Sequence, residues 1–299
     1  MFKTLTDTSK AAIFTALVLI LAVAAALAIN TLGLASSEFA WGAVWSITPV
    51  LATLIMMLVV TRDGYSRSGW QYLGLGRLGL RMWPIAFSGT LAITVAATAA
   101  VWATPLASVI APAGGIINSA VSLVIQVLLL ATTFSLAEEI GIRGYLLPKL
   151  LPLGRKRALL VSGLVWATWH MPLLFLTPLI PVGNKVIGVP LFYAAVVAGS
   201  FFYGYLRIVS GSLWPASIGH AMHNSAWGLM VAFTATSYPV LVNSYLLGDS
   251  GILITVGAAA GAVLVGRMMP RGGKARPDPN QPVLEPVTSI TATAASSQV

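Results

Sequence analysis

Two adjacent carboxylates, Glu138 and Glu139, lie in the apolar segment AEEIGIRGYLL. A carboxylate at the centre of a bilayer costs roughly 2.5 kcal/mol or more on insertion scales, and neighbouring like charges repel each other. The other six acidic residues fall in predicted loops or termini: Asp7, Glu38, Asp63, Asp249, Asp278 and Glu285. The glutamate pair therefore needs a partner, a hydrated cavity or a chemical role.

All three histidines of the chain also lie in apolar segments, His170 in one and His220 with His223 in another. A helix rises about 1.5 Å per residue, which places Glu138, His170 and His220 about 12 to 18 Å from the cytosolic ends of their predicted helices. That depth is the cytosolic half of the bilayer or its midplane. The shared depth predicts that these residues form one polar site.

Helical spacing separates the two glutamates by role. Glu139 and Arg143 are four residues apart, so they share a helix face and are expected to form a structural ion pair. Glu138 points about 100° away and has no charge partner on its own helix. A carboxylate of this kind near His170 is suited to activating a water molecule as a general base.

The second histidine-bearing segment offers hydrogen-bond donors. His220 and Asn224 are four residues apart and together could stabilise a developing oxyanion. His223 lies off that face and is interpreted as a packing or supporting residue. Trp166 and Trp169 precede the first histidine on its segment, and packing explains them more simply than chemistry does.

Composition indicates an integral membrane protein. The chain of 299 residues is 57% hydrophobic and only 8% charged, whereas soluble domains carry about 25% charged residues. The absence of cysteine excludes disulfides, thiol catalysis and cysteine-ligated zinc. The net charge of +9 is better explained by the cytosolic edges of membrane helices than by nucleic-acid binding.

Windows of about 20 apolar residues predict an all-α polytopic bundle of about eight transmembrane helices. The predicted spans are 11–33, 39–61, 82–107, 117–147, 158–176, 186–207, 212–235 and 251–268. The fourth is expected to bend at Gly141 or Gly144, or to stop at Pro148. With both termini in the cytosol, all but one of the 17 Lys and Arg residues lie on the cytosolic side, and Lys185 is the exception.

The chain is expected to have four parts. Residues 1–116 hold the N-terminal helices, the first being a retained span rather than a cleaved signal peptide, with a basic cytosolic surface loop at 62–81. Residues 117–235 hold the polar residues and form the predicted catalytic core. The last helix lies in 236–268, and 269–299 is a predicted disordered cytosolic tail.

Several protease signatures are missing from the sequence. It contains no HExxH zinc motif, no Gly-x-Gly-Asp aspartyl signature and no GxSxG elbow. Three other short motifs occur in order on separate predicted spans: Glu138-Glu139-x-x-x-Arg143, Trp166-x-x-x-His170 and His220-x-x-x-Asn224.

With these three motifs, the chain resembles the CPBP family of intramembrane proteases, which groups CAAX prenyl endopeptidases with bacteriocin-immunity (Abi) relatives. The resemblance covers about residues 117–235. Phe is commoner in that family at the position of Trp166. The resemblance implies an eight-helix bundle with a conical cavity that opens to the cytosol and the bilayer. It also implies hydrolysis of a peptide bond near the C-terminus of a membrane-anchored or lipidated peptide.

The resemblance assigns roles to the same residues. Glu138 and His170 would activate the water, while His220 and Asn224 would stabilise the oxyanion. The supporting residues would be Glu139, Arg143, His223 and Trp166. The expected location is a bacterial cell membrane, with the site open to the cytosolic side.

Three alternatives stay open at this point. We favour catalysis without a metal, but Glu138, His170 and His220 are ligand types that could hold zinc. A non-catalytic scaffold or immunity partner could keep the polar cluster for folding or for binding another membrane protein. A transporter or proton relay is a further alternative, because intramembrane Glu and His often carry protons.

Overall fold

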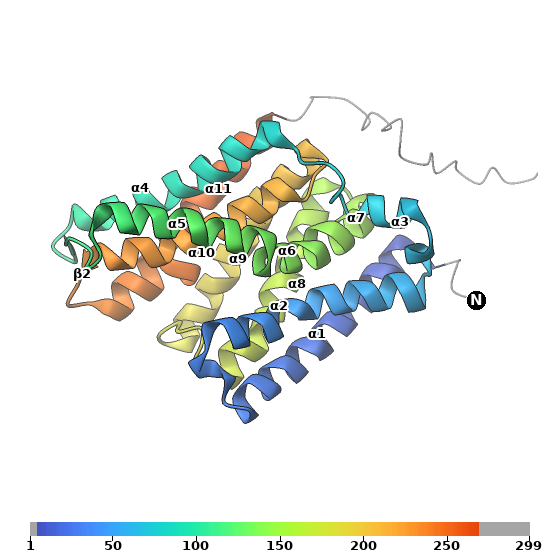
Figure 1. Ribbon diagram of the computed structural model, residues 1–299, viewed down its shortest axis with the longest axis horizontal. Coiled ribbons are helices and arrows are strands. Elements are labelled where there is room, and N and C mark those ends of the chain that lie inside the picture. The colour runs from blue at the N-terminus through green and yellow to red at the C-terminus, as the bar shows by residue number, and fades with distance from the viewer. Residues whose placement is uncertain (1–4, 269–299) are drawn as a thin grey trace, which may run out of the picture. The chain divides into compact units, whose positions relative to one another are not determined.

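The computed structural model of the chain describes residues 5–268, and its secondary structure is almost entirely helical (Figure 1). The predicted tail at 269–299 lies outside the described residues. Six helices in the described part are long and apolar enough to cross a membrane: Asp7–Thr31, Glu38–Val60, Leu80–Trp102, Gly115–Leu153, Arg155–Leu176 and Lys185–Ser210.

These six helices coincide with the first six predicted spans. The other two predicted spans are also helical. They form α10 (Trp214–Ala232) and the apolar but shorter α11 (Ile252–Arg267). The count of eight and the orientation of the termini therefore stay predictions.

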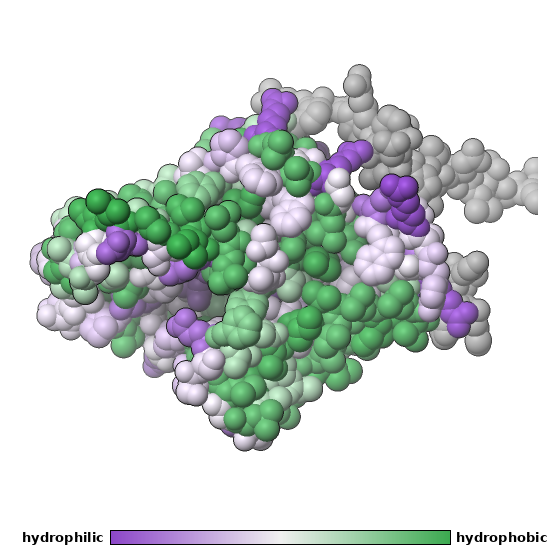
Figure 2. Space-filling view, viewed as in Figure 1, coloured by the Kyte–Doolittle hydropathy of each residue, from purple (hydrophilic) through white to green (hydrophobic). Residues whose placement is uncertain are grey.

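Large apolar side chains cover much of the outside of the helices. Ile117 and Leu128 on the fourth span are 79% and 64% exposed, and Ile20 on the first span is 66% exposed. Figure 2 shows large hydrophobic areas over the first two spans and over the fourth, with paler and hydrophilic side chains between them. Exposed apolar areas of this size are typical of a protein that is surrounded by lipid.

The fourth span is interrupted before it reaches the glutamates. It consists of α5 (Gly115–Thr132), α6 (Phe134–Glu139), the π-helical turn η6 (Ile140–Leu146) and α7 (Leu147–Leu150). The break is at Thr133, whose φ and ψ are −126° and −99°. Gly141 and Gly144 both lie in the π-helical turn, so the expected irregularity is present there.

Of the two predicted alternatives, the irregularity at the glycines is present and the stop at Pro148 is not. Pro148 lies in the first turn of α7, and the helix continues beyond it. A proline is tolerated in a first turn because its missing N–H would have no partner there in any case. The π-helical turn before it ends one run of hydrogen bonds and allows the next to start.

The first two long helices support the centre of the bundle. The helix α2 (Glu38–Leu54) packs against α1 (Asp7–Thr31), α6 and η6. A Cβ atom at Gly141 would collide with Pro49 of α2, so the glycine permits this close approach. The ring of Trp45 of α2 packs against that of Trp169 of α8 (Arg155–Leu176), with centres 4.4 Å apart. The Trp169 indole donates to Thr48 Oγ1 at 3.0 Å.

The remaining helices surround the same region. The helix α9 (Lys185–Ser210) packs against α8, α10 and α11, while α10 packs against α5 (Figure 1). Asn184 caps the start of α9 by accepting from the Val186 N–H. Gly211, with a φ of 65°, ends it in the left-handed conformation that glycine adopts at low cost.

Two features organise the ends of α10. The short strand β1 (Ser108–Val109) pairs antiparallel with β2 (Thr234–Ala235), which ties the loop after α4 (Thr90–Trp102) to the end of α10. The chain then forms the π-helical turn η8 (Val240–Leu246) and the 3-10 turn η9 (Gly248–Ser250) before α11 begins. The turn η9 packs against α9.

A charged cluster joins the predicted cytosolic surface loop to the helix ends. Lys149 Nζ lies 3.4 Å from Asp7 Oδ1 and 4.5 Å from the centre of the Tyr72 ring. Arg207 donates to the Tyr72 carbonyl at 3.2 Å. Burial raises the pKa of the Tyr72 phenol to about 12, Asp7 and Asp63 act in the same direction, and Arg207 opposes them.

Candidate active site

The two adjacent glutamates at the end of α6 are buried and make different contacts. Glu138 Oε2 accepts a hydrogen bond from the Trp166 indole at 3.2 Å. Glu139 Oε1 lies 2.9 Å from Arg143 Nη1 and 3.1 Å from His220 Nδ1. The two side chains therefore point to different partners, as the 100° helical step predicts.

The predicted Glu139–Arg143 ion pair is present, and both side chains are fully buried. The guanidinium carbon of Arg143 lies 4.0 Å from the centre of the Trp166 ring, which adds a cation–π contact. Three buried atoms of the pair have no hydrogen-bond partner among residues 5–268: Arg143 Nε, Arg143 Nη2 and Glu139 Oε2. Glu139 also contacts His220, so this pair does more than neutralise a buried charge.

His170 is held by both hydrogen bonding and ring contacts. Its Nδ1 lies 2.8 Å from the Trp166 carbonyl oxygen. A carbonyl oxygen only accepts, so Nδ1 carries the proton, and in the neutral ring Nε2 keeps a free lone pair. The rings of Trp166, Trp169 and Phe192 surround the imidazole, with centres 5.7, 4.6 and 5.4 Å away.

His220 is buried between two aromatic rings. Its ring stacks on Tyr203 at 5.8 Å and meets the edge of Trp166 at 5.2 Å. With Nδ1 directed at Glu139, its Nε2 is the nitrogen left to meet a ligand. The stacking fixes the plane of the imidazole, and the carboxylate fixes its rotation.

Trp166 is the residue that joins these groups. Its indole N–H donates to Glu138, its carbonyl accepts from His170, and its ring contacts His220 and Arg143. The hydrogen bonds of the described residues thus connect Glu138 to His170 through Trp166 and not directly. The sequence favoured a packing role for this residue, and its hydrogen bond to Glu138 was not foreseen.

Asn224 and His223 lie one turn beyond His220 on α10. Asn224 is exposed and makes no hydrogen bond with another described residue, so its amide is available to a ligand. His223 is partly buried, and its Nε2 lies 3.2 Å from Asp249 Oδ1.

Asp249 is the residue that the sequence analysis missed. It was placed in a loop, but η9 brings its carboxylate to His223, midway along α10. It also interacts electrostatically with His170 and His220. Glu138 and Glu139 are therefore not the only acids at this depth. The sequence signal that could have revealed Asp249 is Gly248, which has a φ of 67° and allows the tight turn.

The zinc alternative does not fit the arrangement of the polar groups. The part of the chain that the structure describes contains no group of three or more His, Asp or Glu residues placed to hold a metal ion. We therefore derive no catalytic step through a metal.

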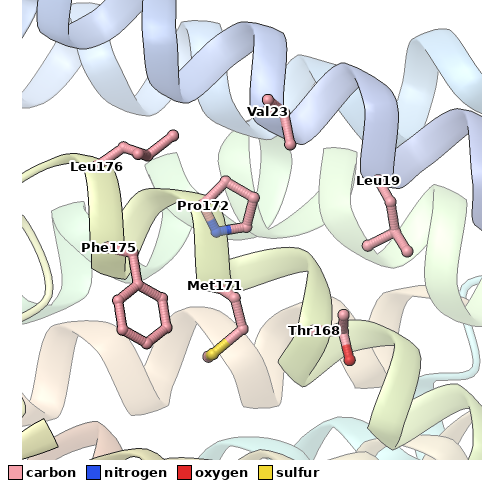
Figure 3. Close-up of a pocket in the computed structure, with 7 residues that line it drawn as sticks. All are labelled: Leu19, Val23, Thr168, Met171, Pro172, Phe175 and Leu176. Atoms are coloured by element: carbon pink, nitrogen blue, oxygen red, sulfur yellow. The ribbon is translucent and has the colours of Figure 1, made fainter.

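An apolar groove of about 370 Å³ lies between α1 and α8. Leu19 and Val23 of α1 line it, together with five residues of α8: Thr168, Met171, Pro172, Phe175 and Leu176 (Figure 3). At about 100° per residue, these five side chains centre on the face of α8 opposite His170. The groove is therefore separate from the polar site.

The comparison with known families agrees with the geometry. Residues 120–226 match the family Type II CAAX prenyl endopeptidase Rce1-like. This segment is an Rce1-like domain. It contains every residue of the three motifs, from Glu138 to Asn224, whereas α1, α2 and Asp249 lie outside it.

The family inferred from the three motifs is thus confirmed for this segment. No curated protein matches the chain. The long apolar helices indicate a multi-pass membrane protein, and its residues 120–226 match a CAAX protease family.

Proposed function

We propose that the protein is an intramembrane endopeptidase that hydrolyses a peptide bond of a membrane-anchored peptide. The observation that carries the proposal is the arrangement around Trp166. This one residue contacts a buried carboxylate and two imidazoles, all within the segment that matches the Rce1-like family. A carboxylate and imidazoles held in this way are suited to water activation and charge stabilisation.

Glu138 and His170 would activate the water. Trp166 holds one oxygen of Glu138 and leaves the other, Oε1, to accept a proton from water. His170 donates from Nδ1 to a carbonyl, so its Nε2 can accept a hydrogen bond from the same water molecule. The water oxygen would then attack the peptide carbonyl carbon while its proton moves to Glu138.

His220 and Asn224 would stabilise the oxyanion that this attack creates. His220 uses Nδ1 to donate to Glu139, so donation from Nε2 as well requires a doubly protonated ring. The Glu139 carboxylate balances that charge, and Arg143 in turn holds Glu139 in place. The exposed amide of Asn224, one helical turn away, is the second donor.

The substrate class follows from the location of the site. Polar residues within a bundle of apolar helices are accessible to a peptide that is already anchored in the bilayer. The family match supports a CAAX-type substrate with a prenylated C-terminus. A bacterial cell membrane is the location that we propose. The distribution of Lys and Arg residues supports an opening toward the cytosol.

The test is cleavage of a membrane-anchored reporter peptide by the purified protein in lipid vesicles. We expect cleavage by the unmodified protein and its loss in the Glu138→Ala and His170→Ala variants. The Asp7→Asn variant serves as the control, because it removes an acid that pairs with Lys149 outside the site. Full activity in both site variants would overturn the proposal.

A further inference from the structure

The hydrogen bond between His223 and Asp249 is not used by the mechanism above. It joins the middle of α10 to a turn that follows it in the chain by more than twenty residues. The His223 side chain is 18% exposed and that of Asp249 is 51% exposed, so a ligand can reach both. His223 lies three residues after His220 on α10, which places the pair beside the candidate active site.

The turn that carries Asp249 is closely built. Gly248 has a φ of 67°, and a Cβ atom there would lie 2.5 Å from the Asn243 carbonyl oxygen and 3.2 Å from the Trp227 ring. Ser250, on the other side of Asp249, is buried and donates its hydroxyl to the Ser244 carbonyl. These contacts fix the backbone on both sides of the carboxylate. Asp249 is therefore held toward His223 rather than left on a loose loop.

The hydrogen bond defines what His223 can do. A carboxylate accepts only, so His223 Nε2 carries a proton and donates it to Asp249. A second proton on Nδ1 gives the ring a positive charge, which the neighbouring carboxylate balances at membrane depth. His223 lies three residues from His220, on an adjoining part of the same helix face. His223, with Asp249 beside it, can thus carry a proton for transfer close to the oxyanion donors His220 and Asn224.

Hydrolysis of a peptide bond requires such a proton. The amine is a poor leaving group unless its nitrogen is protonated as the C–N bond breaks. The other polar groups already have tasks, because Glu138 and His170 address the water while His220 and Asn224 address the oxyanion. His223 is the remaining imidazole, and Asp249 gives it a fixed orientation.

We propose that His223 protonates the leaving amine and that Asp249 is its positioning residue, a role that rests on the function proposed above. Water adds to the carbonyl carbon, and one of its protons moves to Glu138. The C–N bond then breaks, and the nitrogen takes the Nδ1 proton of His223. The products are a carboxylic acid and an amine. Glu138 returns its proton to the solvent, and His223 takes one from it.

The test compares two membrane-anchored substrates that differ only in the bond to be cleaved, one an amide and the other a thioester. A thiolate leaves without protonation, so only amide cleavage needs the acid. We expect His223→Gln and Asp249→Asn to lower kcat for the amide on the order of 100-fold, in the range of general acid catalysis. For the thioester, kcat should stay within about threefold of the unmodified protein.

Further variants separate chemistry from folding. Asp249→Glu keeps a carboxylate and should recover much of the amide activity, and combining His223→Gln with Asp249→Asn should be no worse than the more severe single change. Asp7→Asn should affect neither substrate. Size-exclusion profiles in detergent report folding for each protein.

Each remaining outcome has a defined meaning. Equal losses on the amide and the thioester, or no loss on the amide, would overturn the role of His223 and Asp249. An unmodified protein that cleaves neither substrate would instead overturn the proposed function itself.

Discussion

The hydrogen bond from Trp166 to Glu138 gives the sharpest prediction about the candidate site. The Trp166→Phe substitution keeps an aromatic ring between His170 and His220 but removes the indole N–H that donates to the carboxylate. Phe is also the commoner residue at this position in the family that the chain resembles. The smaller ring should therefore fit, and the change tests the hydrogen bond rather than the packing.

The size of the effect follows from the burial of Glu138, which is 8% exposed. A hydrogen bond to a charged group contributes about 1.5–3 kcal/mol. If that bond orients Glu138 in the transition state, its loss should lower kcat by about 10- to 100-fold, since about 1.4 kcal/mol corresponds to a factor of ten. KM should change little, because the indole N–H faces the glutamate and not the substrate.

The assay is the rate of reporter-peptide cleavage in vesicles at several substrate concentrations, with thermal unfolding measured on the same preparations. Trp102→Phe is the matched control, because its indole donates to Thr234 Oγ1 at 3.1 Å, at the β2 end of the structure. That variant should lose some stability and keep its kcat. A stable Trp166→Phe protein with kcat within threefold of the unmodified protein would refute the reasoning.

Three further predictions concern stability, each measured by thermal or chemical unfolding in detergent. Glu139→Gln leaves Arg143 buried without a counter-charge and should lower the unfolding free energy by about 3–5 kcal/mol. Adding Arg143→Gln should restore part of that loss. An unchanged unfolding free energy would contradict this prediction. Gly141→Ala places a Cβ against α2 and should lower the unfolding free energy by about 1–3 kcal/mol. Gly144→Ala, whose Cβ would have its nearest contact at 3.4 Å, should lower it clearly less. Equal losses would disprove the packing argument. The pKa of Tyr72 is raised, so its neutral phenol stabilises the fold fully below about pH 10, and this stabilisation is lost as pH rises through about 12. The Tyr72→Phe variant should therefore lose less unfolding free energy than the unmodified protein as pH rises. An equal loss in both proteins would exclude Tyr72 as its source.

Local helix geometry explains which parts of the site were predictable. The spacing of Glu139 and Arg143 fixes their pairing, because both residues lie on one helix and only the 3.6-residue period is needed. The six long helices follow from runs of apolar residues in the same way. The third contact, from Glu139 to His220, joins residues 81 positions apart and depends on how α6 and α10 pack.

The features that were not predicted depend on tertiary structure. Asp249 follows a Gly in a polar stretch and reads as a surface loop, and only the packing of η9 on α9 brings it to His223. No glycine or proline lies next to Thr133, so the sequence does not predict the helix break there. Trp166 was interpreted through its ring, because a sequence gives no information about where an indole N–H points.

The contacts between α2 and the core have a practical consequence for protein engineering. Trp45 and Thr48 hold the helix that bears His170, and Pro49 is the surface against which the turn after the glutamates is shaped. All three residues precede the segment that carries the recognisable motifs. A chimera that contains only residues 120–226 would have the reactive groups but lack the side chains that hold them in place. The N-terminal helices should therefore be transferred together with this segment.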